Sequence, residues 1–72
     1  AAPEDHTEEI ALTEREQEVI DAVARGDRSK EIGVKLGITE RTVKAHLTNI
    51  YNKLGVDSRA AAVAEAMQRG WL

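Results

Sequence analysis

Residues 29–54 read SKEIGVKLGITERTVKAHLTNIYNKL and predict two helices joined by a tight turn. The first helix is expected to open at Ser29, a residue type that caps helix N-termini, and to place Ile32 and Leu36 on one face. Gly37 follows directly, at a point where the end of a helix needs a residue that tolerates positive φ. The sequence therefore predicts a helix that stops abruptly before a second one begins.

The second helix has a clear cap and a clear apolar face. Thr39 precedes it as the N-cap. Spacings of four, three and four then separate the apolar residues Val43, Leu47, Ile50 and Leu54, which share one side of a helix. Gly33 lies on the inner side of the first helix, where a missing side chain allows close approach. Two helices joined by a short glycine turn are typical of a helix-turn-helix, whose second helix enters the DNA major groove.

If the apolar stripe faces inward, the opposite face of the second helix carries the DNA contacts. The predicted base contacts are Arg41, Lys44, Ala45 and Thr48, because N-terminal residues of a recognition helix reach the base edges. Lysine donates to guanine, alanine fits against a thymine methyl, and threonine donates or accepts. The predicted phosphate contacts lie at helix starts or further along the helix: Lys30, Thr39, Thr42, Asn49, Asn52 and Lys53.

The roles of two further residues, His46 and Arg59, are open. His46 lies beside the apolar stripe, and we expect a half-buried histidine with one hydrogen bond; the alternative is a phosphate contact. Arg59 either pairs with Glu16 or Glu31 and holds the last helix in place, or touches a phosphate. We favour the structural role for Arg59.

Helices are also predicted on both sides of this pair. Thr13 and Glu16 form a capping box that opens the first helix of the chain, which ends at Gly26. Ser58 or Asp57 is expected to cap a last helix that ends before Gly70.

The last helix is apolar nearly all round, and a domain of this size has no second layer to cover it. We therefore expect its outer face to form a two-fold dimer contact through Ala60, Val63, Ala64 and Met67. The alternative is that Trp71 and Leu72 fold back over this face.

The net charge of −3 is unevenly distributed over the 72 residues. Residues 1–27 hold nine acids and two bases, a balance of −7, whereas residues 28–59 hold seven bases and three acids, a balance of +4. Because phosphate binding depends on the local field, the basic part can still bind DNA. Residues 1–11 are expected to be an acidic flexible linker or tail, and residues 12–72 the DNA-binding domain.

Composition excludes several other classes. The chain has no cysteine and only two well-separated histidines, so we expect neither a disulfide nor a metal site. We expect no cofactor, no membrane span and a cytoplasmic location. An enzyme would need a nucleophile, a base and an orienting group in one pocket, and the chain offers little for one. The remaining alternative is a helical protein-interaction or sigma-factor-like module, but such a surface favours exposed apolar anchors over the polar residues seen here.

The chain resembles the LuxR-type (NarL/FixJ) DNA-binding domain of bacterial transcription regulators. The matching residues are L-T-x-R-E-x-E-V at 12–19, Gly26, K-E-I at 30–32, Leu36, T-V-K-x-H at 42–46, Ile50, K-L at 53–54, S-R at 58–59, Ala62 and Gly70.

The resemblance implies an all-α domain of four helices. It also implies binding to inverted-repeat DNA as a homodimer through the fourth helix, with the third helix in the major groove and Lys44, Ala45 and Thr48 at the bases. It further implies a preceding receiver or signal-binding domain, and we expect the effector of a two-component response regulator. Gly33 departs from the family's usual alanine, which is expected to loosen the second helix.

Overall fold

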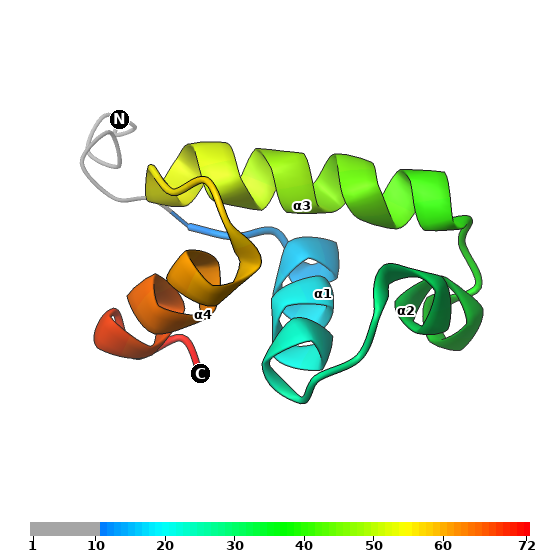
Figure 1. Ribbon diagram of the computed structural model, residues 1–72, viewed down its shortest axis with the longest axis horizontal. Helices are drawn as coiled ribbons and strands as arrows, with labels where there is room; N and C mark the ends of the chain where they lie inside the picture. The colour runs from blue at the N-terminus through cyan, green and yellow to red at the C-terminus, as the bar shows by residue number, and fades with distance from the viewer. Residues whose placement is uncertain (1–10) are drawn as a thin grey trace, which may run out of the picture.

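The computed structural model describes residues 11–72, and the predicted linker or tail at residues 1–11 lies almost wholly outside them. Four helices follow in order: α1 (Glu14–Ala24), α2 (Ser29–Leu36), α3 (Glu40–Leu54) and α4 (Arg59–Gln68). The predicted all-α, four-helix fold is confirmed. Figure 1 shows α3 as the longest helix, with α1, α2 and α4 all on one side of it. Because the other three helices pack on this one side, the opposite side of α3 is left to solvent.

Most of the predicted helix ends are confirmed by their hydrogen bonds. Thr13 Oγ1 accepts from the Glu16 amide at 3.1 Å, and Glu16 Oε1 accepts from the Thr13 amide at 3.0 Å, which completes the capping box. Thr39 caps α3 by accepting from the Thr42 amide at 3.1 Å. Ser58, rather than Asp57, caps α4, and its hydroxyl accepts from the Ala61 amide at 3.1 Å.

The predicted cap at Ser29 is wrong by one position. Arg28 occupies the N-cap of α2 with extended backbone (φ −92°, ψ 161°), and Ser29 is the first helical residue and is buried. The Glu31 carboxylate accepts from the Arg28 amide at 2.7 Å. An acidic group placed three residues into the helix therefore satisfies a backbone donor at the N-cap, and α2 begins without a serine cap.

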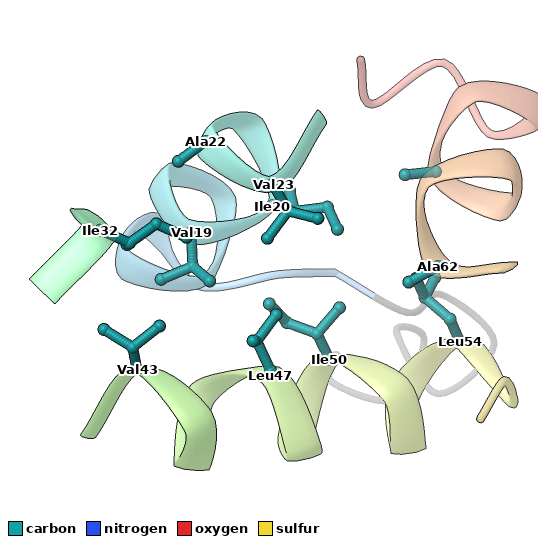
Figure 2. Close-up of a cluster of buried hydrophobic side chains, with 11 residues drawn as sticks. Val19, Ile20, Ala22, Val23, Ile32, Val43, Leu47, Ile50, Leu54 and Ala62 are labelled. Carbon is teal, nitrogen blue, oxygen red and sulfur yellow. The ribbon is translucent and has the colours of Figure 1, made fainter. Parts of the chain in front are cut away.

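The core lies between α3 and the other helices. The apolar stripe of α3 is buried as predicted, with Val43 and Ile50 fully buried and Leu47 and Leu54 nearly so. Figure 2 shows these side chains pointing toward residues of the other three helices. Those partners are Val19, Ile20, Ala22, Val23, Ile32, Ala62 and Ala66. The packing of this stripe fixes which side of α3 remains outside.

Gly33 sets the distance between α2 and the turn that leads into α3. A Cβ built on Gly33 would lie 2.7 Å from the Ile38 carbonyl oxygen, closer than real Cβ contacts allow. The predicted close approach is confirmed. Gly37 then ends α2 with φ 72°, a left-handed conformation that glycine adopts without strain. The two glycines thus make the short turn that orients α3 against α2.

Candidate nucleic-acid interface

The outward face of α3 carries the residues that the sequence assigned to DNA bases. Arg41, Lys44, Ala45 and Thr48 are all exposed, on the side opposite the buried stripe. Thr48 Oγ1 donates to the Lys44 carbonyl at 3.1 Å, a bond within the helix. The structure therefore brings all four candidates onto one exposed surface.

Lys44 already has a partner in this structure. Its ammonium lies 3.4 Å from the Glu40 carboxylate one turn earlier, and both side chains are about half exposed or more. Exposed pairs of this kind contribute little stability. Lys44 can therefore exchange Glu40 for a stronger acceptor on a ligand at small cost.

Five of the six predicted phosphate contacts are exposed. Thr39 and Thr42 lie at the start of α3 with their hydroxyl oxygens 2.9 Å apart, and Lys30 lies at the start of α2. Asn49 and Asn52 lie further along α3. These residues flank the base-contact candidates, an arrangement suited to the two sides of a groove.

Lys53, the sixth, has a structural partner that sequence reasoning missed. Its Nζ lies 2.6 Å from Glu16 Oε1 and 3.3 Å from the Ala11 carbonyl oxygen. Glu16 is buried, with only 4% of its surface exposed. The capping box was the available signal, because it turns the Glu16 carboxylate back toward the start of α1, where Lys53 approaches. The phosphate role of Lys53 stays a prediction, since its ammonium is engaged in this structure.

Two opposing effects act on the pKa of Glu16, and the resulting pKa lies below its ordinary value. Burial raises it by disfavouring the charged carboxylate. The hydrogen bond from Lys53, the bond from the Thr13 backbone and the positive charge of Lys53 lower it and together outweigh burial. Glu16 is therefore held as a carboxylate that joins the start of α1 to the last turn of α3.

His46 and Arg59 are the two residues whose roles the sequence left open. His46 is half-buried, as predicted, and within residues 11–72 its ring makes no hydrogen bond, so the expected bond is not found there. The predicted pairing of Arg59 with Glu16 or Glu31 is wrong, because its Nη1 donates to the Asp27 carbonyl oxygen at 2.8 Å. Arg59 thus holds the start of α4 against the α1–α2 loop.

Asp27 also joins this loop to α2. Its carboxylate lies 2.8 Å from Lys35 Nζ, and this hydrogen bond is the main cause of the lowered pKa of Asp27. The α1–α2 loop is therefore connected to both α2 and α4.

The exposed face of α4 is the surface predicted for a dimer. Ala62 and Ala66 are buried in the core, whereas Ala60, Ala64 and Met67 are exposed and Val63 is half-buried. Met67 alone is 62% exposed. Every exposed residue of this set is apolar and most are small, so a second helix can approach closely.

The alternative cover for this face is wrong. Trp71 packs against the core, and its carbonyl oxygen accepts from Gln17 Nε2 at 2.9 Å, which holds the C-terminal residues against α1. Trp71 and Leu72 leave Ala60, Ala64 and Met67 exposed.

Comparison with known proteins identifies the domain that carries this surface. The family described as "Bacterial regulatory proteins, luxR family" matches residues 10–66. The chain belongs to the LuxR family. Like other members, it is a DNA-binding helix-turn-helix output domain of transcription regulators, not an enzyme.

Its curated relatives are longer proteins. The transcriptional regulatory protein YdfI of Bacillus subtilis is 56% identical over 64 residues, which cover 89% of this chain and 30% of YdfI. The probable transcriptional regulatory protein NarL of Mycobacterium tuberculosis is 47% identical over 58 residues, covering 81% of this chain and 27% of NarL. The chain thus spans less than a third of the length of these relatives.

Solved structures share the arrangement of helices. The transcription factor GerE is 39% identical with a TM-score of 0.81, over 85% of this chain and 91% of GerE. The response regulator ChrA of a heme-sensing two-component system is 44% identical with a TM-score of 0.83, over 86% of this chain and 31% of ChrA. Within residues 11–72, no helix is long and apolar enough to cross a membrane. The same residues contain no group of three or more His, Cys, Asp or Glu side chains that could hold a metal ion.

Proposed function

We propose that this LuxR-family domain binds an inverted-repeat promoter sequence as a dimer, with α3 of each copy in a major groove. The observation that carries the proposal is the division of α3 into two faces. One face is buried in the core, and the other presents Arg41, Lys44, Ala45 and Thr48 to solvent. A helix with a polar exposed face and an N-terminal half available for contact suits the groove.

The side chains divide into base readers and backbone contacts. Lys44 is positioned to donate to guanine N7 and O6, and Arg41 reaches a base or a phosphate from the first turn. Ala45 allows close approach and contacts a thymine methyl, beside Thr48. The exposed hydroxyls and amides of Thr39, Thr42, Asn49 and Asn52, with Lys30, suit the sugar-phosphate backbone on either side.

The dimer is proposed to form through the exposed apolar face of α4. Two copies related by a two-fold axis would place Ala60, Val63, Ala64 and Met67 against the same residues of the partner. Such a contact removes from water the apolar surface that one chain leaves exposed. Each copy would then present α3 to one half of an inverted repeat.

The parent protein is proposed to be a two-component response regulator, with this domain as its effector and a receiver or sensor domain elsewhere in the chain. Two findings support this proposal. The chain spans less than a third of its regulatory relatives, and ChrA, of similar structure, is named as a response regulator.

Base recognition is tested by selecting duplexes from a random pool and measuring affinity by fluorescence anisotropy. Lys44→Ala is expected to cost about 1–3 kcal/mol on the selected sequence and much less on random DNA. Lys35→Ala removes the same charge from α2, where Lys35 pairs with Asp27, and serves as the matched control. Equal losses of affinity for both variants would contradict a base-reading role of Lys44. If the unaltered chain does not bind DNA even at low salt, a protein-interaction module is favoured instead.

Dimerisation is tested with Met67→Glu, which places a charge on the exposed face of α4. This variant is expected to keep its fold and its affinity for a half-site while losing cooperative binding to the full repeat. Ala24→Glu, an exposed position on α1, is the control for adding a charge elsewhere. Unchanged cooperativity in Met67→Glu would contradict a dimer through α4.

A further inference from the structure

Glu40 is the only acidic residue of α3, the helix proposed to enter the major groove. It is the first residue of the helix, directly after the Thr39 cap, and its side chain is 48% exposed. A carboxylate in the first turn interacts favourably with the helix dipole. At the DNA-facing end of a recognition helix, however, the same carboxylate is repelled by phosphates. A favourable contact with DNA at this position must therefore involve a hydrogen-bond donor.

The Glu40 carboxylate is paired with a predicted base contact. Its Oε2 lies 3.4 Å from Lys44 Nζ, one turn along α3, and the Lys44 side chain is 65% exposed. Lysine offers only donors and an ionised carboxylate offers only acceptors. The ion pair therefore presents a donor group and an acceptor group to solvent side by side.

A G·C base pair presents the complementary pattern in the major groove. Guanine N7 and O6 accept, and the N4 amino group of the paired cytosine donates. Guanine O6 and cytosine N4 are joined by a hydrogen bond of about 3 Å, close to the 3.4 Å between the Glu40 and Lys44 charges. Lys44 over the two guanine acceptors would thus leave the Glu40 carboxylate beside the cytosine amino group.

The other base pairs do not offer this order of groups. Read in the same direction, G·C presents acceptor, acceptor and donor, whereas A·T, T·A and C·G each present an acceptor in the third place. A carboxylate opposite an acceptor makes no hydrogen bond and is repelled. Such a repulsive contact contributes to specificity by weakening the complexes with incorrect sequences.

We propose that Glu40 is a specificity-determining residue, which accepts from the N4 amino group of the cytosine paired with the guanine that Lys44 reads. The proposal rests on the proposed binding of α3 in the major groove. Glu40 and Lys44 keep their ion pair in this complex, so neither charge is left without a partner next to the DNA. On random DNA, the Glu40 carboxylate instead faces acceptors and phosphates and weakens binding.

The proposal predicts opposite effects of Glu40→Ala on two kinds of DNA, measured by fluorescence anisotropy. Affinity for the duplex selected by the unaltered chain should fall about tenfold through loss of the cytosine contact. Affinity for random duplex should rise about threefold, because a charge that repels phosphates is removed. Glu14→Ala is the matched control, since Glu14 is also an exposed first helical residue after a threonine cap, on α1. It should not weaken binding to the selected duplex.

The base pair is identified by measuring every single substitution in one half-site. Lys44→Ala should relax the preference for guanine at one position, and Glu40→Ala should relax the preference at that same base pair. Glu40→Asp should also lose preference there, because its carboxylate is one methylene shorter.

Three results would overturn the role of Glu40. They are equal tightening of Glu40→Ala on both kinds of DNA, an equal effect of Glu14→Ala, and relaxed preference at a base pair that Lys44→Ala leaves unchanged. In each case the unaltered chain still selects its sequence, so the proposed function stands. If the unaltered chain selects no sequence, the proposed function fails and the role of Glu40 fails with it.

Discussion

Replacing Lys53 by methionine should show how strongly the last turn of α3 is held to the start of α1. Methionine keeps most of the aliphatic stem but removes the ammonium that contacts Glu16 at 2.6 Å. Glu16 is 4% exposed, so the substitution leaves a buried carboxylate without its cation. Breaking a fully buried pair costs about 3–5 kcal/mol, but the Lys53 side chain is one-third exposed, which reduces the expected loss to about 2 kcal/mol.

The expected loss is large for a domain of this size. A chain of this length is stabilised by about 3–10 kcal/mol in total. A loss of about 2 kcal/mol should lower the Tm by roughly 8–16 °C, measured by circular dichroism at pH 7. Lys35→Met is the matched control, because the Lys35 side chain is 57% exposed in its pair with Asp27, and its Tm should change much less. Adding Glu16→Gln to Lys53→Met should restore part of the loss by removing the buried charge.

The dependence on pH distinguishes an ion pair from a simple packing change. In the unaltered chain the folded-state pKa of Glu16 is below its ordinary value of 4.5. Its contribution to stability is therefore present above about pH 4.5 and is lost as the pH falls through the folded-state pKa. In Lys53→Met, burial is expected to raise the pKa of Glu16, so the destabilising charge is removed by protonation at low pH. The difference in stability should be largest near pH 7 and shrink below about pH 4. Equal Tm values at pH 7, or a loss that is the same at pH 7 and pH 3, would refute this reasoning.

Substitutions at three further positions test the turn, a cap and the C-terminal contact. Gly33→Ala should destabilise the domain by about 1–2 kcal/mol in a urea titration. The new Cβ would lie 2.7 Å from the Ile38 carbonyl oxygen, and the cost of this clash should outweigh the better helix propensity of alanine. A gain in stability would mean that the turn relaxes freely. Ser58→Ala should cost about 1 kcal/mol through loss of the α4 cap, whereas Ser58→Asp should retain most of the stability. Gln17→Ala removes the donor to the Trp71 carbonyl and should shift the tryptophan fluorescence to longer wavelength with a loss of about 1 kcal/mol; an unchanged spectrum would show that packing alone holds Trp71.

The exposed faces of α3 and α4 were predictable from sequence for one physical reason. The apolar residues at 43, 47, 50 and 54 have the spacing of one helix face. Burying that face leaves the residues on the opposite side of the helix exposed to solvent. On α4, Ala60, Ala64 and Met67 of the predicted outer face are likewise exposed, whereas Ala62 and Ala66 are buried. Whether these faces bind bases and a second copy stays a prediction.

The features that depend on neighbours within a few residues follow from the amino-acid sequence alone. These are the four helices, the caps at Thr13 and Thr39, the glycine ends and the side of α3 that packs inward. Each of them is settled by hydrogen bonds and periodicity inside one helix or turn, so local residue types are sufficient.

Contacts between residues far apart in the chain depend instead on how the helices pack. Lys53 contacts Glu16 across 37 positions, and Arg59 donates to the Asp27 carbonyl oxygen across 32 positions. Trp71 is held through Gln17, and the closeness of Gly33 to Ile38 depends on how α2 meets the turn into α3. A long polar side chain can reach several partners, and the packing of the helices decides which one it meets.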